Sequence, residues 1–377
     1  MRHKAATLPE LVQTSDSFDA LVDDLGRQAR IAVDTESNSL HAYRERVCVM
    51  QFSTSQRDYV VDALALDTAA PLGAIFASPR IEKIFHAAEY DILCLRRDYG
   101  FTFNNIFDTM QAGRILGSKL AGLDRLLQEK FGVEVNKRLQ KANWGARPLS
   151  PELLEYAAQD THYLIPLRDL LEQALLEKGL LELAQEDFRM ACADHNHRVN
   201  ERGESPAWAR LSGRRDITPR ELTILKELLD WRDLVAQRLD RPPFKGLGDE
   251  RLIELARARP TNREELKGVA LPERPERQWG LEILQAVDRG LKAPLVHRTR
   301  PAMPAAVYLK RLELLKAWRK KTAAEMDVES DVVLPRGLLL ALADGGAQEM
   351  ASVMSASPWR QQRFGDQISA VLQKSSS

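Results

Sequence analysis

The sequence predicts an α/β domain with a mixed five-stranded sheet flanked by helices, followed by two all-α helical-bundle domains. In the first half, three apolar runs joined by short loops come first, and further strands then alternate with helical segments. In the second half, apolar residues at helical spacing recur at a constant offset of 87 positions. The 377 residues also exceed what one ordinary core accommodates, so several domains are expected.

Composition limits the class of protein only loosely. Lys plus Arg and Asp plus Glu both number 54, so net charge neither favours nor excludes a nucleic-acid partner. The three cysteines are far apart without CxxC spacing, which indicates a reducing compartment and no zinc site. No apolar run approaches the ~18 residues of a membrane span, and the first residues lack a signal-peptide core. We therefore expect a cytoplasmic protein with no membrane partner.

The elements of the first domain, residues 1–190, follow from local patterns. Phe18, Leu21 and Leu25 predict a helix over 16–25, with Ser15 or Asp16 as its cap. The elements expected next are strands 30–36, 47–53 and 59–61, helix 71–77, strand 81–86, helix 87–99 and strand 105–107. A hairpin loop joins the second and third strands, and the pattern after Asp108 is helical to about residue 185.

Two acids, Asp34 and Glu36, end the first strand. Residues two apart on a strand point to the same face, so these carboxylates are expected side by side. Two carboxylates this close repel each other, and burying them is costly unless a cation binds between them. Hard divalent cations prefer such oxygen ligands. The alternative is a strand end at which both acids simply reach solvent.

Three further residues are candidates on helices. Asp91 falls near the first turn of helix 87–99, where the helix dipole favours an anion whether or not the residue has a function. Pro151 after Ser150 marks a helix start, and Tyr156 and Asp160, four apart, share one face of that helix. Alternatively, Tyr156 packs in the core and Asp160 bonds locally.

Taken together, the strand Asp-x-Glu, the strand-then-helix Asp and the helical Tyr-x-x-x-Asp resemble the motifs of the DEDD superfamily of 3′–5′ exonucleases. The tyrosine in the third motif places the likeness in the ribonuclease D-like branch, over residues 15–185. Neighbouring residues match as well: Gln51, Phe107-Asp108-Thr109, Trp144 and Arg147-Pro148-Leu149. Asn143 and Gly145 depart from the Asp and Ser that often flank the tryptophan, which bears on substrate detail rather than activity.

The resemblance implies a ribonuclease H-like fold and a metal-dependent 3′–5′ exoribonuclease that releases nucleoside 5′-monophosphates. Its substrate would be the 3′ ends of structured RNA, tRNA precursors above all. The implied catalytic residues are Asp34, Glu36, Asp91, Tyr156 and Asp160, and the four acids would be the metal ligands. Two Mg²⁺ or Mn²⁺ ions are expected, one on Asp34, Glu36 and Asp160 and the other on Asp34 and Asp91. Tyr156 would orient the attacking water, and the alternative is that it takes the proton of that water with the help of the nearby cations.

Three further residues that could bind a metal are expected to have structural roles instead. His86, His162 and Cys94 lie near the motifs, but no His/Cys cluster has zinc-ligand spacing. The sequence also lacks a Gly-x-x-x-x-Gly-Lys-Ser/Thr run, so nothing indicates an NTP-driven motor.

The second half begins with a polar linker, residues 191–214, which Trp208 and Leu211 are expected to dock onto a neighbouring domain. The repeated pattern then resembles the helicase-and-RNase-D C-terminal (HRDC) domain, first over 215–297 and again, more diverged, over 303–375. Trp231-Arg232 in the first copy corresponds to Trp318-Arg319 in the second.

Such modules usually assist nucleic-acid binding, and basic residues of both copies are candidates for that role. They are Arg251, Arg257, Arg259 and Arg263 in the first copy and Lys310, Arg311, Lys316, Arg319, Lys320 and Lys321 in the second. The alternative is a solvated face on which acids alternate with these cations. For the whole chain, the other functions considered are a helicase-associated type of 3′–5′ DNA exonuclease, which would bind single-stranded DNA, and a non-catalytic RNA-binding scaffold.

Overall fold

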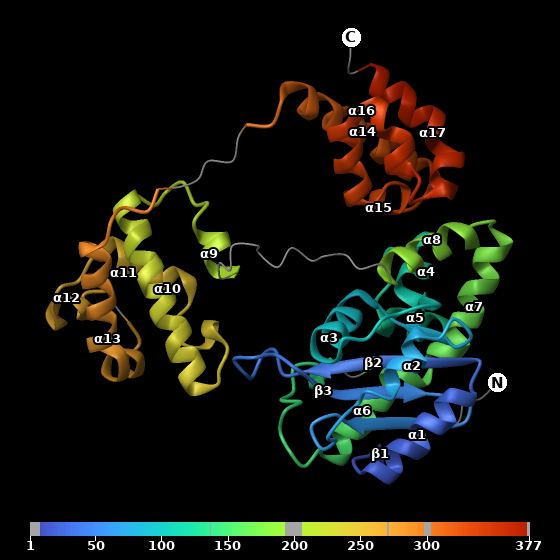
Figure 1. Cartoon of the computed structure of the whole chain (residues 1–377), viewed down its shortest axis with the longest axis horizontal. Helices are drawn as coiled ribbons and strands as arrows, with labels where there is room; N and C mark the ends of the chain where they lie inside the picture. The colour runs from blue at the N-terminus through green and yellow to red at the C-terminus, as the bar shows by residue number, and fades with distance from the viewer. Residues whose placement is uncertain (1–7, 136, 193–205, 270, 298–302, 375–377) are drawn as a thin grey trace. The chain divides into compact units, whose positions relative to one another are not determined.

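The computed structural model describes residues 8–135, 137–192, 206–269, 271–297 and 303–374 (Figure 1). The chain forms two compact units. One comprises Met1–Ser37, Val47–Asp194 and Met303–Ser377, and the other comprises Asn38–Arg46 and His195–Ala302. Across the described ranges, no helix combines the length and the apolar character that crossing a membrane requires.

The first unit is built on a mixed sheet with strand order β1-β4-β3-β2-β5-β6. The strands are β1 (Glu10–Val12), β2 (Arg30–Ser37), β3 (Val47–Ser53), β4 (Asp58–Asp62), β5 (Glu82–Phe85) and β6 (Ile106–Asp108). Strands β2, β3 and β4 form an antiparallel meander, whereas β5 runs parallel to β2, β6 to β5, and β1 to β4. The predicted mixed sheet is confirmed, but the count of five strands is wrong, because β1 is too short to show alternation.

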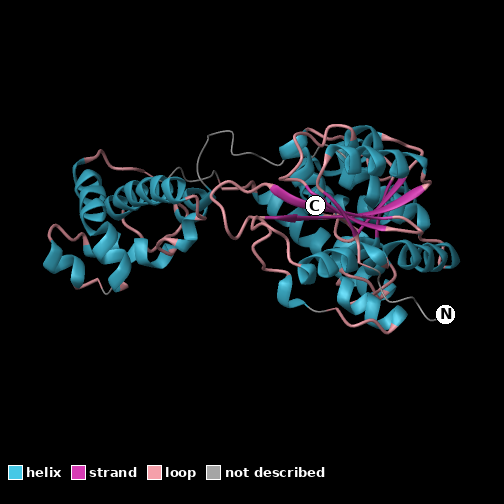
Figure 2. Ribbon diagram, turned by 90° about the horizontal axis from the view of Figure 1, so that it is seen from below, coloured by secondary structure: helices cyan, strands magenta, loops and turns pink. Residues whose placement is uncertain are grey.

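Helices cover both faces of this sheet (Figure 2). They are α1 (Ser15–Arg27), α2 (Leu72–Ala77), α3 (Glu89–Tyr99), α4 (Thr109–Ile115), α5 (Leu123–Phe131), α6 (Pro151–His162), α7 (Leu164–Glu177) and α8 (Leu181–Cys192). A 3₁₀ turn, η1 (Lys137–Leu139), precedes the loop to α6. Helix α1 is capped by Thr14, not by Ser15 or Asp16 as expected, because the Thr14 and Ser17 side chains each bond the other residue's backbone N–H.

Strand β3 is buried along its whole length because helices pack on both of its faces. Helix α6 packs across β2, β3 and β4. Beneath α6, Trp144 and Tyr156 form a small apolar cluster with Cys48, Val49 and Val60. This packing fixes the position of α6 against the carboxyl-terminal half of β2.

The remaining helices form two bundles. The first contains α10 (Pro219–Leu239), η2 (Pro243–Lys245), α11 (Asp249–Ala258), α12 (Arg263–Lys267) and α13 (Glu273–Lys292), and the second α14 (Ala306–Met326), α15 (Ser330–Val333), α16 (Arg336–Met354) and α17 (Pro358–Gln373). Part of the predicted linker, 193–205, lies outside the described residues. Its later part forms α9 (Pro206–Leu211), where Leu211 is buried in the first bundle's core and Trp208 packs against it.

The internal repeat is visible in matched backbone and side-chain interactions. Arg232 donates to the carbonyl of Leu247 at 2.9 Å, and its counterpart Arg319 donates to the carbonyl of Leu334 at 3.0 Å. The helices α10 and α14 also end alike. Asp240 and Asp327 both adopt left-handed conformations, with φ of 46° and 51°. The two bundles therefore share one local design.

A buried ion pair joins the second bundle to α8 of the sheet-containing domain. The fully buried guanidinium of Arg360 donates to both carboxylate oxygens of Asp187, at 2.7 and 3.0 Å. It also donates to the backbone carbonyl of Val332 at 2.8 Å. Removing one partner of such a pair leaves a buried charge without compensation.

We predict that Arg360→Ala lowers the free energy of unfolding of this unit by about 3 kcal/mol or more, because Asp187 loses its counter-charge in a dry site. Lys321→Ala, which removes a cation paired to Glu325 on the exposed surface of α14 in the same unit, is the control and should cost under about 1 kcal/mol. Urea unfolding of the full chain measures both. Equal losses in the two variants would contradict the assigned role of Arg360.

Candidate active site

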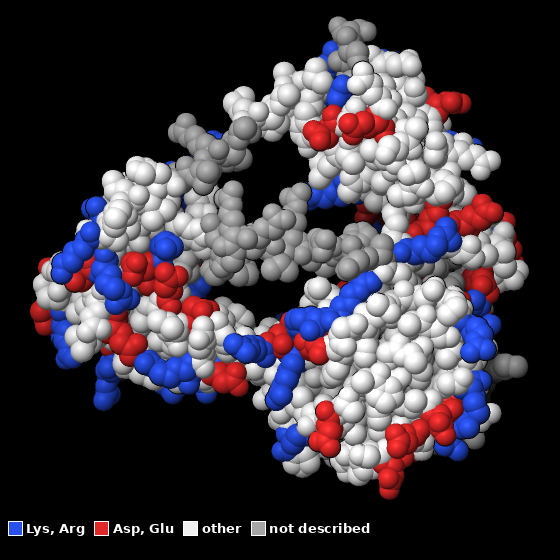
Figure 3. Space-filling view, viewed as in Figure 1, with Lys and Arg blue, Asp and Glu red and all other residues white. Residues whose placement is uncertain are grey.

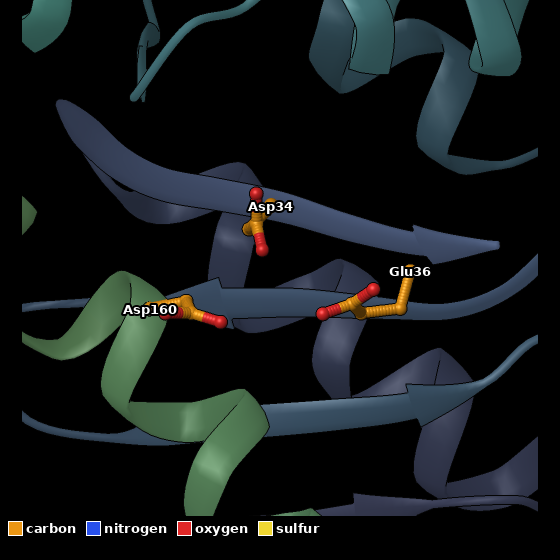
Figure 4. Close-up of side chains that lie close together, drawn as sticks. All are labelled: Asp34, Glu36 and Asp160. Carbon is orange, nitrogen blue, oxygen red and sulfur yellow. The ribbon is translucent and has the colours of Figure 1, made fainter. Parts of the chain in front are cut away.

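Three carboxylates converge where β2 passes under α6. Asp34 and Glu36 project from the same face of β2, and Asp160 projects toward them from α6 (Figure 4). Each of the three offers an oxygen that lies within 4.8 Å of the others. All three side chains are partly exposed, so the cluster opens to solvent.

The start of α6 sets the direction of the third motif. Ser150 caps the helix by accepting a bond from the backbone N–H of Leu153 at 3.3 Å, and Pro151 follows at the first helical position. Tyr156 and Asp160 then share the face that meets the sheet. The Tyr156 ring is buried, and its centroid lies 6.0 Å from that of Trp144.

Asp91 is not one of the three converging carboxylates. Strand β5 ends at Phe85 and pairs with β2 only as far as Ala32, so the edge of β2 beside Thr35 has no strand neighbour there. The buried carboxylate of Asp91 occupies this position and accepts a hydrogen bond from the Thr35 hydroxyl. Asp91 is nevertheless close enough for its charge to raise the pKa of Asp34.

The acids perturb one another strongly. Burial, followed by the charges of Asp91, Asp160 and Glu36, raises the pKa of Asp34 well above its ordinary value. Burial and the neighbouring Asp160 and Asp91 raise the pKa of Glu36 to about 9. Burial also raises the pKa of Asp91 and of Asp160 to about 7 each. Negative charge is therefore costly here until a cation compensates it.

The donor set suits a hard divalent cation. Among the described residues, no Lys or Arg forms a salt bridge with Asp34, Glu36, Asp91 or Asp160, although most other partly buried acids of this domain have a basic partner. Carboxylate oxygens gathered within one coordination sphere are the ligands that Mg²⁺ and Mn²⁺ prefer. The residues present thus fit the metal that the motifs imply.

Supporting residues complete the site. Gln51 lies directly across from Asp34 on β3, is fully buried, and both polar atoms of its amide have no partner in the described parts of the chain. Thr35, which the motif analysis did not single out, binds Asp91. From the sequence, the alternation of side chains along β2 predicts only that Thr35 and Asp34 lie on opposite faces of the strand. It does not predict the contact between Thr35 and Asp91.

The loop before α6 is held by Arg147. Its guanidinium contacts both carboxylate oxygens of Asp62 at 2.6 Å and the carbonyl of Cys48 at 3.0 Å. Asn143 and Gly145 are the two residues that differ from the family pattern. The Asn143 side chain accepts a hydrogen bond from the backbone N–H of Gly145 at 3.2 Å. Asn143 therefore shapes its own turn and does not join the acids.

The three extra candidates have local partners or are buried. His86 Nδ1 lies 2.9 Å from the Thr109 hydroxyl, and His162 Nδ1 lies 2.7 Å from Asp58. Burial lowers the pKa of His86. Cys94 is buried in the main core. These surroundings agree with the structural roles expected from the sequence.

Comparisons with known proteins agree with this architecture. Residues 9–176 match the 3′–5′ exonuclease family, and residues 221–287 and 309–372 each match the HRDC domain. A ribonuclease D of Acidiphilium cryptum is 33% identical over 264 residues, covering 69% of this chain and 66% of that protein. The exosome complex exonuclease RRP6 of Saccharomyces cerevisiae is 32% identical over 269 residues.

The yeast match covers 68% of this chain but only 37% of that relative's length. The crystal structure of Escherichia coli RNase D superposes with a TM-score of 0.69 at 23% identity, covering 98% of this chain and 99% of that one, which establishes a shared fold. The chain therefore belongs among the 3′–5′ exonuclease proteins that carry HRDC domains. Within that class its relatives are the ribonuclease D and RRP6 proteins.

The raised pKa values predict how stability depends on pH when chelator removes metal. In the folded chain Glu36, Asp91 and Asp160 keep protons that the unfolded chain releases near pH 4, so the folded state binds more protons up to about pH 7–9. Stability in EDTA should therefore fall as pH rises from 5 to 9, and Mg²⁺ should restore it most at the alkaline end.

Thermal unfolding of the wild type and of Glu36→Gln, each in EDTA and in Mg²⁺, measures this dependence. The variant cannot ionise at position 36, so its melting temperature in EDTA should fall less steeply between pH 7 and 9. Parallel curves for the two proteins would show that Glu36 does not titrate in this window.

Proposed function

We propose that the protein is a metal-dependent 3′–5′ exoribonuclease that trims structured RNA, with tRNA precursors as its substrates. The observation that carries the proposal is the convergence of Asp34, Glu36 and Asp160 on one partly exposed site, where no Lys or Arg of the described ranges pairs with them. The family match and the ribonuclease D and RRP6 relatives support the class of reaction. In this proposal residues 1–190 hydrolyse the RNA, and the helical modules at 215–297 and 303–375 bind it.

The four acids have distinct positions that suit two cations. Asp34, Glu36 and Asp160 would hold one, and Asp34 with Asp91 would hold the other, since Asp91 approaches β2 from its open edge. Bound there, Mg²⁺ or Mn²⁺ would supply Lewis-acid stabilisation of the attacking water and of the leaving 3′-oxygen. The product is a nucleoside 5′-monophosphate.

Tyr156 serves to orient the water rather than to remove its proton. Burial and the charges of Asp160, Glu36 and Asp34 raise the pKa of the Tyr156 phenol, so the hydroxyl keeps its hydrogen at neutral pH. A protonated phenol beside the carboxylates can donate one hydrogen bond and accept another. It can therefore hold a water or a phosphate oxygen in position without changing its own charge.

The basic edge expected on the first helical module is largely neutralised. Arg251 pairs with Glu254, Arg257 with Asp216 and Arg259 with Glu221. Figure 3 shows Lys and Arg interspersed with Asp and Glu over the visible face of this module. Its contribution to RNA binding must then come from cations without such partners.

We predict that Asp34→Ala and Asp160→Ala each reduce hydrolysis by about a thousandfold or more, since each removes a ligand of the cation that stabilises the transition state. Glu155→Ala, which removes an exposed acid from the same helix as Asp160, is the matched control and should retain activity. The assay follows the ends released from 3′-extended tRNA and from matched single-stranded DNA in Mg²⁺, Mn²⁺ or EDTA.

Folded Asp34→Ala protein with wild-type turnover would exclude this site. Faster release from the DNA than from the tRNA would instead identify a DNA exonuclease. Activity that persists in EDTA would contradict metal dependence.

We also predict that Tyr156→Phe lowers the rate constant of hydrolysis by about tenfold or more while the Kd for RNA changes little, because only the orienting hydroxyl is lost. Single-turnover kinetics and filter binding in EDTA separate the two quantities. An unchanged rate would remove Tyr156 from the mechanism.

A further inference from the structure

Thr35 interacts with both of the acids assigned above to the second cation. It follows Asp34 on β2, and its hydroxyl donates a hydrogen bond of 2.5 Å to Oδ1 of Asp91. Its backbone N–H acts on both carboxylates. Burial raises the pKa of Asp34 and of Asp91, and hydrogen bonding from the Thr35 N–H opposes the rise at each of them. A single residue therefore links the two acids.

The backbone that carries Asp91 is held in place without Thr35. Apolar residues of α3 are buried in the main core. In the turn before this helix, the backbone N–H groups of Ala87 and Ala88 donate to the buried carboxylate of Asp108, at 3.1 and 2.9 Å. Ala87 has a left-handed conformation, with φ of 64°, which these bonds maintain. The fixed backbone leaves only the side-chain torsions of Asp91 to be set.

The Thr35 hydroxyl sets those torsions. In the part of the chain that the structure describes, no other side chain donates a hydrogen bond to the Asp91 carboxylate. A threonine suits this task because two heavy atoms on its Cβ restrict the rotation of the side chain. Its hydroxyl is therefore presented in a defined direction from a paired strand, since Thr35 pairs with Met50 of β3.

A hydroxyl is also the right kind of partner for an acid that binds a cation. A carboxylate has about four acceptor positions, so one bond to Oδ1 leaves positions for a metal ion. The hydroxyl carries no charge and does not repel an arriving cation, as a Lys or Arg in its place would. Groups that hydrogen-bond metal ligands in this way orient them and tune metal affinity.

The effect of Thr35 should be confined to one of the two cations. The oxygens of Asp34, Glu36 and Asp160 converge within 4.8 Å of one another, and Asp91 is not part of that group. The Thr35 hydroxyl bonds Asp91, which lies at the edge of β2. Loss of this hydroxyl therefore changes the surroundings of Asp91 while the three converging acids keep theirs.

We propose that Thr35 is a positioning residue for the second cation. Its hydroxyl holds the Asp91 carboxylate in the orientation in which that group binds the cation together with Asp34. The inference deepens the function proposed above and rests on its two-cation arrangement. Thr35 is not itself a ligand and acts through Asp91.

The test uses three full-length variants and the wild type. Thr35→Val removes the hydroxyl and keeps the branched shape, whereas Thr35→Ser keeps the hydroxyl. The matched control is Thr161→Val, which removes another buried hydroxyl, the one that bonds Ser53 at 2.7 Å beside α6. Mn²⁺ is titrated in the presence of adenosine 5′-monophosphate and followed by EPR. Two ions that share Asp34, about 3.5–4 Å apart, give a spin-coupled signal.

We expect Thr35→Val to weaken the second Mn²⁺ by about tenfold or more and the first by less than about threefold, because only Asp91 loses its partner. The spin-coupled signal should therefore require correspondingly more Mn²⁺ in this variant. Thr35→Ser and Thr161→Val should bind both ions as the wild type does. Retention of the first ion also shows that the Thr35→Val protein is folded.

A double variant tests whether Thr35 acts through Asp91. If it does, Thr35→Val combined with Asp91→Asn binds the second ion no more weakly than Asp91→Asn alone. Additive losses, unchanged binding of the second ion in Thr35→Val, or equal weakening of both ions would each overturn the role of Thr35. A wild type that binds only one Mn²⁺ would overturn the two-cation arrangement and this role with it. A wild type that binds none would overturn the proposed metal-dependent function itself.

Discussion

Mutual repulsion among four acids is the constraint on which the rest of the nuclease domain depends. Asp34 and Glu36 share a face of β2, Asp160 comes down from α6, and Asp91 lies at the strand's edge. Their charges oppose one another in a setting that removes much of their hydration. Only rigid surroundings keep them together before a cation arrives. The buried strand β3 and the Trp144–Tyr156 packing under α6 provide that rigidity.

The sequence was informative wherever one local rule decided the outcome. Period-two alternation placed Asp34 and Glu36 on one face, and the Ser150–Pro151 start fixed α6, which put Tyr156 and Asp160 one turn apart. The 87-residue offset predicted a duplicated bundle, and the equivalent carbonyl contacts of Arg232 and Arg319 show the same local structure in both copies. Motif order then indicated which distant residues belong together.

Features that depend on tertiary contacts could not be predicted in the same way. The three residues of β1 become a strand only because β4 offers a parallel edge. Thr35 points away from Asp34, and nothing in the sequence shows that Asp91 arrives on its side. In the sequence, Arg360 looks like an exposed arginine on a helix. Only the folded structure shows that it pairs with Asp187 of another domain.

The short length of β5 has a consequence for how this active site tolerates change. Because β5 stops at Phe85, the edge of β2 next to Thr35 stays open and Asp91 fills it. Two more residues of regular pairing would bring a neighbouring backbone to the place that this carboxylate needs. Insertions that extend β5 are thus incompatible with the fourth acid, although they would improve the sheet. The early end of that strand is therefore what gives the Asp91 carboxylate its place beside Thr35.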